Sequence, residues 1–235
     1  MIDVYWTAYA EHGTISTFDF SAPQPILPQI NSAYKNLGID QNFSICPAFT
    51  ELHNNSFTLV FPNDYELNIV NDSLSSSFYD QKYYDEMVYL RSIENKLVSY
   101  NIRYLFYCDN SLEVEMLQNN YIKSEFSSNT TLIEGKFNIN QWFRPLDCAF
   151  MIKDSKVKLN KNEPFAVVKF NTSKKVNLKQ FYRTQDIINL QNDLYNTRLY
   201  TKKIIKPLNY FYQKYNEAKI GKLLSKHIRN SVIQN

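Results

Sequence analysis

Short apolar or alternating segments recur through the first 173 residues, and their spacing restricts the fold more than any other feature of the chain. Examples are segments 57–61, 103–108 and 165–170, which are rich in aromatic and β-branched residues. Strands separated by about 8–12 residues are typical of a β-sandwich or barrel rather than of alternating strands and helices. We therefore expect an α+β fold: an antiparallel, β-rich, sandwich-like body followed by C-terminal α-helices.

Turn sequences between these segments predict which strands pair. Two hairpins are expected, each with a polar turn between its strands: 57–61 with 65–69, and 103–108 with 113–117. A meander of three strands is expected further along: 148–152, 156–159 and 165–170. The spacing of Met87, Leu90 and Leu97 predicts one helix within residues 82–97, which would interrupt the sheet.

Glycine is scarce and asparagine abundant, with 4 Gly beside 27 Asn. Asn tolerates the left-handed backbone region better than other side chains do, so Asn54-Asn55 and Asn119-Asn120 are expected at turns. The four glycines are too far apart in the sequence to form a Gly-rich phosphate-binding loop. The classical nucleotide-binding motifs are therefore excluded.

Charge divides the chain into two parts. Residues 1–173 carry 13 basic and 20 acidic side chains, a net charge of −7, and residues 174–235 carry 13 basic and 3 acidic ones, a net charge of +10. This asymmetry predicts an acidic β-rich body over 1–173 and a basic helical extension over 174–235. A basic extension could bind the body itself, a partner subunit or nucleic acid.

Apolar residues in the extension step by three and four, which predicts two amphipathic helices. The first includes Ile187, Leu190 and Leu194, and Thr184 is suited to cap its start. Pro207 should end or kink this helix. The second has a broad apolar stripe with the following members: Phe211, Tyr212, Tyr215, Leu223, Leu224 and Ile228.

The cysteines Cys46, Cys108 and Cys148 are odd in number and far apart, so neither a zinc site nor a disulfide framework is indicated. This pattern favours a reducing compartment. The sequence has no signal-peptide pattern and no apolar run of about 20 residues. We expect no export signal, no membrane partner, no metal and no cofactor.

The most distinctive segment for chemistry is 141–147, in which Trp142, Arg144 and Asp147 lie close together. With Glu163, these residues are the candidate small-molecule site, because an aromatic wall, a cation and two carboxylates could bind a ligand or supply acid and base groups. A core tryptophan beside a structural ion pair is the favoured alternative. Glu113 and Glu115 also share a strand face, as they would on any solvated strand.

The extension supplies candidates for binding nucleic acid or a protein partner. Lysines and tyrosines are interleaved there, and phosphates need cations while bases need aromatic planes. The candidate residues are Lys202, Lys203, Lys206, Lys214, Lys222, Leu223, Leu224 and Arg229. Because the tyrosines fall on the apolar stripe, packing of this stripe on the body or on a second copy is favoured over nucleic-acid binding.

Residues 137–150 and 162–170 resemble segments of uncharacterised proteins of marine tailed bacteriophages of the T-even type. Residues 2–6, at the start of the chain, and residues 44–49 are similar to segments of the same proteins. These segments cover 34 of the 235 residues and do not include the extension. The resemblance implies a viral protein located in the cytoplasm of the bacterial host, with the virion as an alternative location. It implies no activity and no catalytic residues.

These observations favour a non-enzymatic phage protein that works as a binding or assembly module. Its expected partner is a second copy of itself or another phage protein. The first alternative is an auxiliary enzyme with its site near Trp142, Arg144, Asp147 and Glu163. The second is nucleic-acid binding through the basic C-terminal helices.

Overall fold

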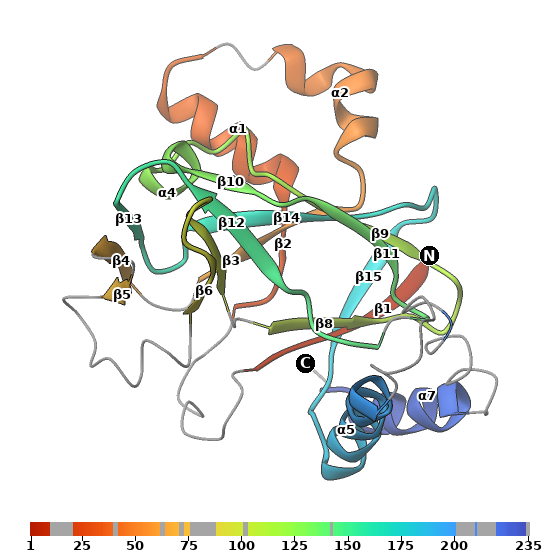
Figure 1. The fold of residues 1–235 in the computed structure, drawn as a ribbon. Helices are drawn as coiled ribbons and strands as arrows, with labels where there is room; N and C mark the ends of the chain where they lie inside the picture. Colours follow the sequence, from red (N-terminus) through yellow and green to blue (C-terminus); the bar gives the residue numbers. More distant parts are fainter. Residues whose placement is uncertain are drawn as a thin grey trace.

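The computed structural model describes residues 1–9, 21–39, 42–61, 64–70, 73–75, 88–100, 103–141, 143–200, 210 and 220–233 (Figure 1). Several sheets pack around one core, and helices follow at the C-terminal end of the chain. The predicted α+β fold with an antiparallel, β-rich, sandwich-like body and C-terminal helices is confirmed.

One sheet is buried on both faces. It joins β1 (Ile2–Tyr9), β8 (Arg103–Tyr107) and β15 (Val176–Gln180) in the order β15-β1-β8, with β15 parallel and β8 antiparallel to β1. Successive side chains of a strand point to opposite faces. Trp6 and Phe106 accordingly enter the main core, whereas Tyr5 and Tyr107 pack under the C-terminal helices.

Two helices cover the outer face of that sheet, α5 (Gln185–Tyr200) and α7 (Ile220–Asn230) (Figure 1). Ile187 and Leu194 of α5 and Leu224 and Ile228 of α7 are buried there, as their spacing predicts. The Thr184 hydroxyl accepts a hydrogen bond from the backbone N–H of Ile187 at 3.5 Å. Thr184 therefore caps α5 as expected.

A larger sheet forms the opposite side of the body. Its order is β11 (Gly135–Asn138), β9 (Glu113–Leu117), β14 (Pro164–Phe170), β3 (Ser56–Val60) and β2 (Gln24–Pro25). Val114 and Val168 face the main core, whereas Val167 packs on the other face against α1 (Ile26–Asn36). The short helices η1 (Asn42–Ile45) and α2 (Pro47–Leu52) follow α1, and α2 lies beside it in Figure 1.

Two further sheets complete the core. One has the order β10 (Thr130–Leu132), β12 (Cys148–Ile152), β7 (Leu97–Tyr100) and β6 (Val88–Ser92), and the other β13 (Lys156–Leu159), β4 (Tyr65–Val70) and β5 (Ser73–Ser75). Helix α4 (Glu125–Asn129) precedes β10 and buries Phe126. Phe126, Tyr100 and Phe150 pack edge to face at centroid distances of 4.9–5.8 Å. Aromatic packing thus joins different elements in one core.

The predicted strands are present, but the predicted pairings are wrong. β3 pairs with β14 and β2, and β4 with β13 and β5, so these neighbours form no hairpin. Similarly β8 pairs with β1, and β9 with β11 and β14. The expected meander strands β12, β13 and β14 lie in three different sheets. Alternation locates a strand and its apolar face, but many strands share that pattern, so long-range packing selects the partner.

The helix predicted within 82–97 is also wrong over residues 88–97, where β6, a turn and the first residue of β7 lie. Val88 is buried and Leu90 packs against the main core. Val88 and Leu90 are two residues apart, which fits one face of a strand, whereas Met87 and Leu90 are three apart, which fits one face of a helix. Met87 itself lies outside the described residues. Short apolar runs do not distinguish the two.

The predicted extension begins with a strand of the body. Ile2 to Trp6 pair in parallel with Val176 to Gln180, so the sheet crosses the predicted boundary at residue 174. Pro207 and the stripe residues Phe211, Tyr212 and Tyr215 lie outside the described residues. Gly221 is the second residue of α7.

Candidate functional site

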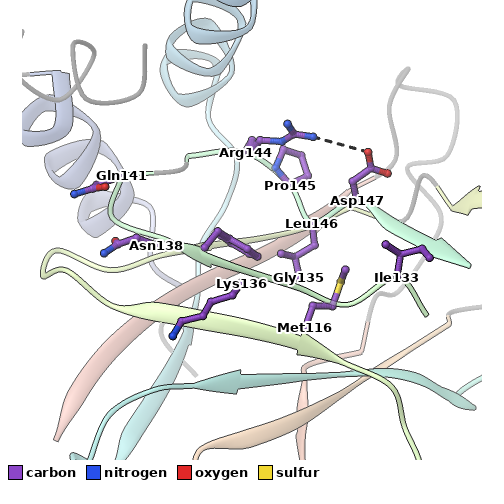
Figure 2. Close-up of a pocket in the computed structure, with 11 residues that line it drawn as sticks. Met116, Ile133, Gly135, Lys136, Asn138, Gln141, Arg144, Pro145, Leu146 and Asp147 are labelled. Carbon is purple, nitrogen blue, oxygen red and sulfur yellow. Dashed lines mark ion pairs between the residues drawn. The ribbon is translucent and has the colours of Figure 1, made fainter. Parts of the chain in front are cut away.

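A pocket of about 400 Å³ lies between the edge strand β11 and the segment that leads into β12 (Figure 2). We name it the β11 pocket. Its lining residues are Met116, Ile133, Gly135, Lys136, Phe137, Asn138, Gln141, Arg144, Pro145, Leu146 and Asp147. Because all four residues of β11 are included, the opening follows the whole length of that strand.

β11 is the last strand of its sheet and pairs only with β9 among the described strands. The backbone N–H of Ile139 donates to Leu112 at 3.0 Å, which continues the same antiparallel register. Hydrogen-bonded pairs alternate along such a ladder. The N–H and C=O groups of Phe137 and Gly135 therefore face β9, and those of Lys136 and Asn138 face the pocket.

An ionic cluster on the adjoining sheet fixes one wall of the pocket. Asp147 accepts a hydrogen bond from Arg91 and lies 3.8 Å from the Arg144 guanidinium, as the dashed line in Figure 2 marks. Arg91 also donates to the Tyr89 hydroxyl at 2.6 Å and to Ser99. Burial alone would lower the pKa of Arg91, but Asp147 and Tyr89 outweigh it and raise that pKa.

The structure brings together two of the four predicted small-molecule residues, Arg144 and Asp147, in the β11 pocket. Glu163 lies elsewhere, before β14, where its Oε2 accepts from the backbone and side-chain nitrogens of Asn160 at 2.9 and 2.8 Å. Glu163 is not among the residues that line the pocket. Trp142 lies outside the described residues.

Glu113 and Glu115 share one face of β9, as predicted. Lys136 on β11 interacts with both, at 3.0 Å from Glu113 and 3.9 Å from Glu115. The hydrogen bond from Lys136 to Glu113 raises the pKa of the lysine. Glu115 also accepts from the Asn171 amide at 3.0 Å. The two carboxylates thus share one cation and an amide of the protein, and no set of three potential metal ligands occurs within the described ranges.

The predicted partner-binding residues of α7 have different surroundings. Leu224 is 1% exposed in the chain's own core, whereas Leu223 is 46% exposed. Lys222 is exposed, and Arg229 is bound to Asp109 by hydrogen bonds of 2.6 and 3.0 Å. Lys202, Lys203, Lys206 and Lys214 lie outside the described residues. Leu224 and Ile228 of α7 therefore pack on the body, whereas Leu223 does not. Binding of a partner or of nucleic acid through the extension stays a prediction.

Sequence reasoning missed the main-chain part of the site. β11 was not predicted as a strand, because only Phe137 gives it an apolar side chain. Arg91 was missed because it lies on β6, far in sequence from Asp147. No local signal reports an unpaired strand edge, since the edge exists only after the sheet has formed.

Comparison with known proteins gives no relative for this chain. No family model, curated protein or solved structure matches it. The resemblance to tailed-phage proteins therefore stays a prediction. No helix in the described part of the chain is long and apolar enough to cross a membrane.

Proposed function

We propose that the protein is a non-enzymatic binding protein that takes up an extended segment of a partner polypeptide along β11. One observation carries this proposal: the β11 pocket follows all four residues of an edge strand. An extended segment can add to such an edge by main-chain hydrogen bonds, while adjacent pockets select its side chains.

The pocket offers both kinds of contact. The outward N–H and C=O groups of Lys136 and Asn138 are the main-chain partners on β11. Met116 and Leu146 provide buried apolar surface beneath them. At the far wall, Arg144 is a cation whose guanidinium suits a carboxylate or a backbone carbonyl of the segment.

Binding fits this geometry better than acid–base catalysis does. Asp147 is held by Arg91 and Arg144, and Glu163, its predicted partner in catalysis, lies outside the pocket. A general acid and base must both reach the reacting atoms. On the resemblance described above, the partner is a second copy or another protein of a phage, met in the host cytoplasm or the virion.

The main-chain requirement can be tested with Lys136→Pro and Lys136→Ala. Both variants lose the side chain that pairs with Glu113, but only proline removes the outward N–H. We expect both to fold, because proline is tolerated on edge strands where the N–H faces outward. Peptides selected on the parent protein from a random displayed library should keep their affinity for Lys136→Ala and lose at least about tenfold for Lys136→Pro.

Fluorescence anisotropy of labelled selected peptides measures these affinities. Amide exchange of Lys136 in the parent protein is a second readout that needs no variant, and bound peptide should slow it. Equal affinity of the two variants, or unchanged exchange at Lys136, would contradict strand addition. If sedimentation shows a dimer that Lys136→Pro abolishes, the partner is a second copy.

A further inference from the structure

A second pocket, of about 220 Å³, lies on the other face of the five-stranded sheet, where α1 packs. We name it the α1-side pocket. Its apolar lining comes from Ile26, Leu52, Leu117 and Val167. Its polar lining consists of His53, Ser56, Gln118, Asn120, Tyr121, Glu134 and Lys169. Its volume is below the roughly 300–1,000 Å³ usual for drug-sized ligands, so it suits a small molecule.

His53 gives this pocket a buried polar group without a protein partner. The residue is 8% exposed, and its Nε2 atom has no hydrogen-bond partner among the described residues. Phe49 and Tyr121 pack edge to face on the imidazole, with ring centroids 4.6 and 4.5 Å from the imidazole centroid, and this packing fixes its orientation. Leaving a buried polar atom unsatisfied is unfavourable, and a bound ligand that hydrogen-bonds to it would offset this cost.

Lys169 places a cation beside His53. Lys169 is the register partner of Ser56 on β3, so both side chains project from the sheet on the face of the pocket. No described carboxylate forms an ion pair with Lys169. Burial lowers the pKa of His53 and the charge of Lys169 lowers it further, so both favour the neutral imidazole. A neutral imidazole with its proton on Nε2 is a hydrogen-bond donor.

We propose that the α1-side pocket binds a small monocarboxylate with an apolar chain. The carboxylate lies between Lys169, the Ser56 hydroxyl and His53 Nε2. The chain lies against Ile26 and Val167, which are 1% and 4% exposed. This site is separate from the β11 pocket, and it does not depend on the proposed function.

The charges of the lining select a monocarboxylate over phosphate. Lys169 and Glu134 are the charged residues of the lining, and they balance. Glu134 accepts a hydrogen bond from the Gln118 N–H at 2.9 Å, which keeps its carboxylate at the pocket. Because the lining has no net positive charge to offset desolvation, a dianion, which costs more to remove from water, is disfavoured relative to a monoanion.

Isovalerate is a suitable probe, because it joins one carboxylate to a branched apolar chain. We expect saturable millimolar binding of isovalerate by calorimetry, and at least tenfold weaker binding of its neutral amide and of inorganic phosphate. Lys169→Met should weaken isovalerate binding at least tenfold. Lys161→Met removes an exposed lysine from another surface and should leave binding unchanged.

The ¹⁵N signal of the His53 Nε2 atom provides a readout in the unaltered protein. Isovalerate should shift this signal, and isovaleramide at the same concentration should not. His53→Phe keeps an aromatic ring against Phe49 and Tyr121 but removes the donor, so it should weaken isovalerate binding. Equal binding of isovalerate and its amide, an unmoved Nε2 signal, or no saturable binding would overturn the proposal.

Discussion

Asn55 connects the start of β3 to the segment that leads into β15. Its side-chain amide donates to the carbonyls of Thr172 and Lys174 at 2.9 Å each, and its Oδ1 accepts from Val176 N–H at 2.9 Å. Its backbone φ of 54° lies in the left-handed region. Asn is therefore needed here both for its backbone tolerance and for its side chain.

A comparison with Asn162 separates these two roles. Asn162 has a φ of 63° but is exposed on a turn. Asn55→Gly accepts the left-handed backbone conformation without strain but loses the three side-chain hydrogen bonds. It should therefore lower the free energy of unfolding by about 2–4 kcal/mol. Asn162→Gly should change it by less than about 0.5 kcal/mol. Denaturant unfolding measures both, and equal effects would show that the Asn55 side chain is unimportant.

At the scale of the element, α7 is held by its apolar face and by one aspartate. Leu224 and Ile228 enter the cluster beneath the helix, and Asp109 binds Arg229 and accepts a hydrogen bond from Ser225. Arg229 is largely exposed, so its ion pair contributes little to global stability. Burial of the apolar face is the main attachment of α7.

Leu223 and Leu224 are neighbours on α7 and form a matched pair. Leu224→Ala should lower the free energy of unfolding by about 2–4 kcal/mol, because it leaves a cavity under the helix. Leu223→Ala should cost less than about 0.5 kcal/mol, since that side chain is 46% exposed. Thermal or urea unfolding distinguishes them. A large loss for Leu223 alone would mean that another copy covers it.

For the whole molecule, burial in the main core determines which cysteines solvent can reach. Cys108 and Cys148 are 1% and 0% exposed, whereas Cys46 is exposed before α2. Burial raises the pKa of both inner thiols, which disfavours their reactive thiolates. Cys46 is thus accessible to reagents in the native protein, whereas Cys108 and Cys148 are not.

An aromatic disulfide reagent should therefore titrate one thiol rapidly in the native protein and three in urea. Cys46→Ser should abolish the rapid phase and leave the two slow thiols unchanged. The absorbance of the released thiolate follows the reaction. Rapid reaction of two or more thiols in the native protein would show that the core opens on the timescale of labelling.

Local patterns predicted part of this molecule correctly. Short apolar or alternating segments located β3, β4, β8, β9, β12, β13 and β14, and the spacing of Ile187 and Leu194 indicated the buried face of α5. The expected turn at Asn54-Asn55 is present, with Asn55 in the left-handed region, whereas Asn119-Asn120 lies in a loop where neither residue has a positive φ. For the site, the sequence indicated Arg144 and Asp147, because a short segment holds both of them. Each of these features depends on residues that are close in sequence.

Local patterns alone therefore specify where seven of the fifteen described strands lie and which of their faces are apolar. Long-range packing sets which strands pair, brings β15 beside β1 and Arg91 beside Asp147, and leaves Glu163 apart from them. The physical reason is that alternation specifies an apolar face and not its partner. Pairing, free edges and pockets arise when distant apolar faces compete for one core, and that competition has no local signature.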